Sequence, residues 1–174
     1  MASLVVEHEK SGERVTVLKS AADTNGAYVR FEVDVPAGFH SIPMHKHPMQ
    51  TERATIIQGR AGAMIGGKPY AFEAGTEMVI PPGKPHRWWN AGEEPLRMIA
   101  QMEPAMRFID FIQAVYDSAN AHNSEQPALF DGVYLLRKYR NEYRLLEVPA
   151  PVQRFVFPVI RAVGYILGKY RKFE

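Results

Sequence analysis

Three histidines and one glutamate in the middle of the chain have the spacing of metal ligands. His45 and His47 form an H-x-H unit, Glu52 follows five residues later, and His86 belongs to a separate segment. Residues two apart on a β-strand project to the same face, so one short strand can present both His45 and His47 to an ion. Imidazole nitrogens together with a carboxylate oxygen suit a divalent transition metal. The sequence therefore predicts one metal site formed by His45, His47, Glu52 and His86.

The donor types limit the metal without selecting one. Three imidazoles and a carboxylate fit Fe(II), Mn(II), Ni(II), Cu(II), Co(II) or Zn(II), and thiolate ligation is excluded because the chain contains no cysteine. Four protein ligands in an octahedral site leave two positions open, where substrate, water or dioxygen can bind. The absence of cysteine also agrees with a reducing compartment, and the first residues lack the features of a secretory signal. We expect a cytoplasmic protein.

The elements that must position these ligands are short strands and a rigid turn. The run from Glu52 to Gln58 is rich in β-branched residues and stops at Gly59, which predicts a strand with the carboxylate at its start. If this strand pairs with the one that bears His45 and His47, the carboxylate can reach the same ion. His86 directly follows the proline-rich stretch 81–85, which predicts a turn that delivers the third imidazole.

The pattern of apolar residues along the chain changes near residue 104. Before it, short alternating runs predict strands; in the clearest one, Val29, Phe31, Val33 and Val35 alternate with charged residues. The predicted strands are 14–18, 29–35, 52–58, 61–65, 69–72 and 96–102. After it, apolar residues recur at helical spacing and predict helices over about 105–117, 127–145 and 152–173. We expect a double-sheet jelly-roll barrel over residues 1–104, followed by about three C-terminal helices over 105–174.

The two histidine segments resemble the two motifs of the cupin superfamily, a group of jelly-roll proteins. The second motif, G-x5-P-x-G-x2-H-x3-N, is complete from Gly75 to Asn90. The first, G-x5-H-x-H-x3-4-E-x6-G, is complete from His45 to Gly59, but six residues instead of five separate Gly38 from His45. The resemblance implies a single cupin domain whose metal ligands are the four residues named above. It also implies pairing into a homodimer.

Strand parity gives a first prediction of the ligand pocket. His86, Trp88 and Asn90 share one face of their strand, so Trp88 and Asn90 are expected beside the metal if His86 points inward. The same parity places Phe31, Val33 and Met98 on inward faces, and plain core packing is the alternative for Trp88. His8 and His122 lie in polar surroundings and are expected at the surface. His40 precedes the metal segment and could border the mouth of the pocket.

The C-terminal segment leaves three arrangements open. From residue 150 onward five basic residues accompany one acid, and the segment 152–173 is amphipathic. Such a helix can lie on an anionic membrane surface, but we favour packing on the barrel or at a dimer interface, because the preceding helices also need partners. A net charge of +2 and a pI of about 8.8 are too mild to indicate nucleic-acid binding.

Three functional hypotheses follow from the expected site. The leading one is a metal-dependent enzyme that acts on a small organic molecule, most simply a dioxygenase, because the full ligand set leaves open coordination positions. The alternative is a metal-assisted isomerase, cyclase or lyase, in which the ion polarises a carbonyl. The third is a barrel that binds or senses a small ligand without turnover.

Overall fold

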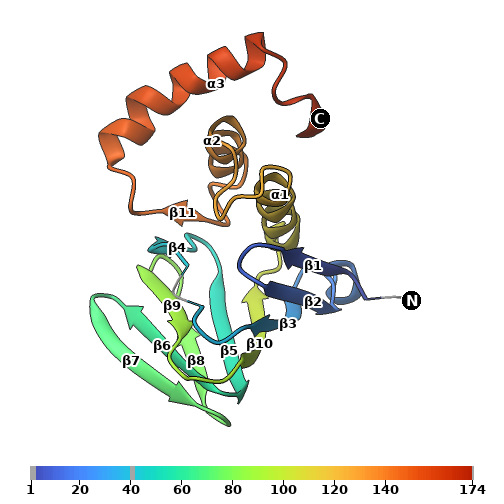
Figure 1. Ribbon diagram of the computed structural model, residues 1–174, viewed down its shortest axis with the longest axis vertical. Coiled ribbons are helices and arrows are strands. Elements are labelled where there is room, and N and C mark those ends of the chain that lie inside the picture. The colour runs from blue at the N-terminus through green and yellow to red at the C-terminus, as the bar shows by residue number, and fades with distance from the viewer. Residues whose placement is uncertain (1–2, 40–41, 174) are drawn as a thin grey trace.

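The computed structural model describes residues 3–39 and 42–173 and contains two antiparallel sheets (Figure 1). The six-stranded sheet has the order β1 (Val5–His8), β2 (Glu13–Lys19), β3 (Val29–Val35), β10 (Leu96–Glu103), β5 (Thr51–Gln58) and β8 (Glu77–Ile80). The five-stranded sheet has the order β11 (Arg144–Leu145), β4 (His45–Lys46), β9 (His86–Asn90), β6 (Arg60–Ile65) and β7 (Lys68–Glu73). The two antiparallel sheets and the three helices agree with the predicted jelly-roll class.

The core lies between the two sheets and follows the predicted alternation. In β3 the side chains of Val29, Phe31, Val33 and Val35 are all buried. Within the same sheet they lie beside the apolar residues of the neighbouring strand β10, which pairs Met98 with Val33. Burying such a two-sided set of side chains is the main favourable contribution to folding.

One glycine of the first motif is required by a close approach of the backbone. Gly59 connects β5 to β6 at a φ of 80°, a conformation that other residues rarely adopt. A Cβ atom there would also lie 2.7 Å from the carbonyl oxygen of Pro95. The sharp turn that starts β6 therefore depends on the missing side chain.

The three predicted helices are present with different bounds. They are α1 (Phe108–Asn120), α2 (Leu129–Lys138) and α3 (Phe157–Ile166), with a π-helical turn at Val152–Val156 and short 3-10 helices at Ala22–Thr24 and Arg171–Phe173. The prediction that the second helix reaches residue 145 is wrong. The chain leaves the helix after Lys138 and adds β11 to the edge of β4, so sheet pairing overrides the local helical pattern.

The prediction of one continuous helix over 152–173 is also wrong at its end. Gly168 has a φ of 65°, and the backbone N–H groups of Lys169 and Gly168 donate to the carbonyls of Gly164 and Tyr165. This is the Schellman arrangement that ends many helices. The interpretation of the segment as one amphipathic helix missed this helix end.

The helices gather at one end of the two sheets, with α3 farthest from them (Figure 1). Phe108 and Tyr116 of α1 belong to the main core, while Phe111 of α1 forms a second core with Leu135 and Tyr139. The outer face of α3 is apolar yet exposed; for example, 85% of Ile166 is accessible. Within the described part of the chain, no helix is long and apolar enough to cross a membrane.

Candidate metal centre

The four predicted ligands come together between the two sheets. His45 in β4 and His86 in β9 are register partners in the five-stranded sheet, and His47 follows β4 by one residue. Glu52 lies in β5 of the other sheet, which pairs with β10 and β8. The strand of Glu52 therefore does not pair with the strand of the histidines, which was one way for the carboxylate to reach the ion. The carboxylate reaches the histidines across the space between the sheets.

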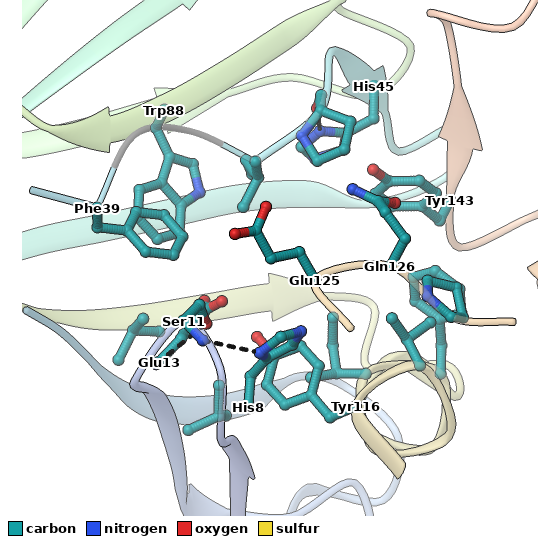
Figure 2. A pocket seen from close by; sticks show the side chains of 18 of the residues that line it. His8, Ser11, Glu13, Phe39, His45, Trp88, Tyr116, Glu125, Gln126 and Tyr143 are labelled. Atoms are coloured by element: carbon teal, nitrogen blue, oxygen red, sulfur yellow. Dashed lines mark hydrogen bonds between the residues drawn. The ribbon is translucent and has the colours of Figure 1, made fainter. Parts of the chain in front are cut away.

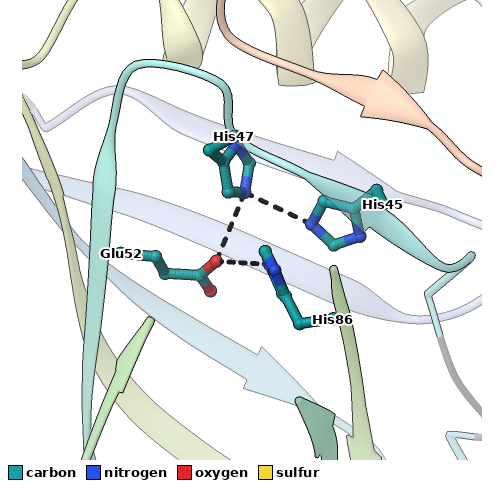
Figure 3. Close-up of side chains that lie close together, drawn as sticks. All are labelled: His45, His47, Glu52 and His86. Carbon is teal, nitrogen blue, oxygen red and sulfur yellow. Dashed lines mark hydrogen bonds and ion pairs between the residues drawn. The ribbon is translucent and has the colours of Figure 1, made fainter. Parts of the chain in front are cut away.

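The ligand atoms converge on one point (Figure 3). Glu52 Oε2 lies 2.9 Å from His86 Nε2 and 3.2 Å from His47 Nε2, and His47 Nε2 lies 3.2 Å from His45 Nε2. One ligand atom from each of the four residues lies within 4.8 Å of the others, and all four residues are buried. A single ion at the centre can therefore contact all four.

Two observations test whether these residues fit a metal. Among the described residues, neither Glu52 Oε2 nor His86 Nε2 makes a hydrogen bond of acceptable geometry, although both atoms are buried. An ion between them would supply the missing partner. The Nδ1 atoms of His45, His47 and His86 lie 2.8, 2.6 and 2.8 Å from the carbonyl oxygens of Pro43, Glu142 and Lys84, respectively. Donation at Nδ1 leaves Nε2 free as the ligand atom, so the donor set fits a divalent transition metal.

The electrostatics of the cluster agree with this assignment. Burial, together with the neighbouring imidazoles of His86 and His47, lowers the pKa of His45 to about 3, so this ring is neutral as a ligand must be. Burial alone would raise the pKa of Glu52, but the imidazoles of His47 and His86 outweigh it and hold the pKa well below 4.5. Burial would likewise lower the pKa of His86, and the Glu52 carboxylate raises it instead. The site thus already contains the anionic carboxylate that a cation needs.

The C-terminal extension completes the support of the histidines, which the sequence did not indicate. Leu145 of β11 pairs with His45, and the backbone N–H of Met44 donates to the Glu147 carboxylate at 3.0 Å. The ring of Tyr143 stacks on His45 with centroids 4.5 Å apart. Sequence reasoning assigned residues 142–145 to a helix, and no motif marks them as neighbours of the metal segment.

A cavity of about 570 Å³ adjoins the cluster (Figure 2). Phe31, Val33, Trp88 and Met98 line it, as strand parity predicts, and Phe39 stacks on Trp88 with centroids 5.6 Å apart. His45, His47 and Glu52 also border it. A ligand in this cavity can therefore approach the ion.

The prediction that Asn90 lines the pocket is wrong. Its side chain is buried on the predicted face, but its amide donates to the carbonyls of Pro36 and Glu94, and its oxygen accepts from the N–H of Gly92. Asn90 is the last residue of β9, so its amide lies beside the loops at the end of the strand and forms hydrogen bonds with them. This residue of the motif fixes loops and does not contact the cavity.

The remaining histidines differ in their environments. His122 is exposed, as predicted, and His40 lies outside the described residues. The expectation that His8 is a surface residue is wrong, because it is 5% exposed and lines the cavity together with Glu13 and Tyr116. The sequence did contain a signal for the burial of Glu13, because strand parity places it on the same face of β2 as the buried Val15 and Val17.

Comparison with known proteins agrees with the cupin resemblance of the sequence. The cupin domain family model matches residues 31–102. The polyketide synthase CurC of Streptomyces cyaneus is 28% identical over 92 residues, covering 53% of this chain and 54% of CurC. The tetracenomycin polyketide synthase protein TcmJ of Streptomyces glaucescens is 26% identical over 106 residues, covering 60% of this chain and 69% of TcmJ. The chain thus spans about half the length of CurC.

The fold is also found among solved structures. A predicted oxalate decarboxylase from Thermotoga maritima superposes with a TM-score of 0.50 at 20% identity, covering 60% of this chain and 93% of that one. At this identity the likeness concerns the fold alone. The family match identifies residues 31–102 of the chain as a cupin domain.

Proposed function

We propose that the protein is a metal-dependent enzyme that acts on a small, largely apolar organic molecule, and that its reaction is of the dioxygenase type. The observation that carries this proposal is the contact between the ligand cluster and the cavity. Three of the four residues, His45, His47 and Glu52, border the same apolar space. The four residues would hold a divalent ion, and an octahedral ion with four protein ligands would keep two positions for other molecules.

The chain's own residues would bind and orient the substrate. Phe31, Val33 and Met98 form an apolar wall, and the stacked Phe39 and Trp88 offer a flat aromatic surface. Such walls exclude water and favour a planar, apolar substrate. A redox-active divalent ion held by the four ligands would supply the electron transfer to dioxygen that oxygenation requires.

The second candidate is a metal-assisted cyclase or isomerase, in which the ion acts as a Lewis acid. The similarity to CurC and TcmJ, both named as polyketide synthase proteins, favours this candidate. A redox-inert ion such as Zn(II) would be sufficient for it. Both candidates use the same ligands and the same cavity, so the native metal and the need for dioxygen distinguish them.

The experiment that tests the proposal begins with elemental analysis of protein purified without chelator, beside the His86→Ala variant. We expect about one equivalent of a transition metal per chain, and its loss in the variant. Oxygen uptake is then measured with aromatic diols and diketones under air, with the His86→Ala variant as the control. Uptake that needs the metal supports the dioxygenase, whereas substrate conversion without oxygen, or a zinc protein, supports the second candidate. A protein that binds no metal after loading would overturn both.

A further inference from the structure

The wall of the cavity formed by β1, β2 and α1 carries a second group of polar side chains (Figure 2). It consists of His8 at the end of β1, Glu13 at the start of β2 and Tyr116 in α1. Glu13 is 7% exposed, and the ring of His8 meets the ring of Tyr116 edge-on with centroids 5.1 Å apart. Nothing in the metal centre uses these three residues.

The Glu13 carboxyl is buried without a cation. Within residues 3–39 and 42–173, no ion pair with Glu13 is found, and Lys10, which also borders the cavity, is exposed and donates to the carbonyl of Asn123. Its side-chain partner is the hydroxyl of Tyr116. Burial raises the pKa of Glu13 to about 7, against the smaller opposing effect of that hydrogen bond. A buried carboxyl kept without a neutralising charge costs stability, which points to a role in binding or chemistry.

The hydrogen-bonding capacity of the group is only partly used. A carboxyl group has two oxygens with several acceptor positions, and Tyr116 occupies one of them. His8 Nδ1 accepts from the backbone N–H of Ser11 at 3.2 Å, which places the ring proton on Nε2. The group therefore offers both an acceptor and a donor, the pair that recognises a hydroxyl group.

The helix α1 runs from one end of the cavity to the other, so its length gives the distance between the two ends. Phe108 lies at the metal end, with its ring 5.5 Å from that of His47. Tyr116 lies eight residues further along the same helix, which at 1.5 Å per residue is about 12 Å away. Between them Ile112 and Val115 contribute apolar side chains to the lining. The cavity thus has a metal end and a polar end with these apolar side chains between them, and Glu125 and Gln126 also line it (Figure 2).

We propose that His8, Glu13 and Tyr116 form a second polar site, which binds a hydroxyl group at the far end of an elongated, otherwise apolar ligand whose near end lies at the metal centre. The inference rests on the proposed function only for the near end. The expected substrate is an aromatic molecule about 10 Å long, with a metal-chelating oxygen group at one end and a hydroxyl group at the other.

The test uses a matched pair of probes that differ in one hydroxyl. Biphenyl-4-carbohydroxamic acid carries a metal-chelating end, and its 4′-hydroxy analogue adds the distal hydroxyl. Dissociation constants are measured at pH 7 by calorimetry with Zn(II)-loaded protein. Because a hydrogen bond to a buried carboxyl is among the stronger ones, we expect the hydroxylated probe to bind about tenfold more tightly.

The variants show whether Glu13 is responsible for the preference. In Glu13→Leu the ratio of the two dissociation constants should fall to about one, while in Glu7→Leu, an exposed residue of the neighbouring β1, it should stay as in the wild type. Should Glu13→Leu not fold, Glu13→Gln replaces it, with an expected ratio of a few, because a neutral amide oxygen accepts a weaker hydrogen bond. Equal affinities in the wild type, or a preference that survives in Glu13→Leu, would overturn the proposal.

Failure of the metal centre is distinguished by a second pair of probes. Biphenyl and 4-hydroxybiphenyl lack a chelating group and are tested with metal-free protein, so their comparison does not depend on an ion. If no metal loads but the hydroxylated probe is still preferred in a Glu13-dependent way, the polar site stands and the proposed enzyme does not. If metal loads but the hydroxylated probe of neither pair binds more tightly, the polar site is refuted and the metal centre is not. The same conclusion follows if metal loads and none of the probes binds.

Discussion

The buried carboxyl of Glu13 makes the stability of the protein depend on pH in a way that one substitution should remove. The pKa of Glu13 rises from its usual 4.5 to about 7 because the side chain is buried. Below pH 4.5 this carboxyl is protonated in the folded and the unfolded protein, and it has no differential effect. Between pH 4.5 and 7 only the unfolded protein releases the proton, so the stability falls as the pH rises. Above pH 7 the loss is complete.

The magnitude follows from the size of that change. Each tenfold difference in proton affinity corresponds to about 1.4 kcal/mol, so the full loss attributable to Glu13 is about 3 kcal/mol. Glutamine has the same shape and does not ionise. The free energy of unfolding of Glu13→Gln relative to the wild type should therefore rise by about 3 kcal/mol between pH 4.5 and pH 8.5.

The assay is urea denaturation of both proteins in chelator at several pH values, because the difference between them cancels the other titrating groups. Glu7→Gln serves as the control, since Glu7 is exposed on β1 and pairs with Arg14. Its difference from the wild type should change little with pH. A difference between Glu13→Gln and the wild type that is constant over this range would refute the reasoning, because it would mean that Glu13 titrates normally.

Three further predictions concern the metal centre and its turn. Glu52→Ala should fold but bind the metal more weakly, and joint replacement of His45 and His47 by alanine should empty the site, both read by elemental analysis; unchanged metal content in both would refute the ligand assignment. Tyr143→Ala removes the ring stacked on His45 and should weaken metal affinity about tenfold in a competition titration, whereas Tyr143→Phe, which keeps a ring, should not. Gly59→Ala should lower the free energy of unfolding by about 1–3 kcal/mol, because the added Cβ meets a carbonyl at a positive φ; equal denaturation midpoints would contradict this.

The sequence was most informative where one physical rule acts alone. Alternation of apolar and charged residues from Val29 to Val35 predicts a half-buried strand, and the structure has a strand with these bounds. The motif spacing likewise identified four side chains that the fold brings together. Each of these predictions needs only the period of a strand or the position of a turn.

The errors occurred where a distant segment decides the outcome. The helical pattern after Leu129 continues past Lys138, but pairing with β4 draws residues 144–145 into a sheet instead. Local periodicity contains no information about this partner, which lies about a hundred residues earlier in the chain. The polar setting of His8 suggested the surface for the same reason, since the wall that buries it includes Tyr116 of α1.

Both α1 and the segment before β11 contact the cavity, at opposite ends. The carbonyl of Glu142 accepts from His47, 95 residues away in sequence, and Tyr116 brings a hydroxyl to Glu13 at the opposite end of the cavity. The ligand set alone describes only a place for an ion between two sheets. Here the part of the chain after residue 104 contacts two ligands, His45 and His47, at the metal end and supplies one of the three polar residues at the other end. We therefore propose that the extension helps to select the molecule that fits between the two ends, while the cupin domain would hold the ion that acts on it.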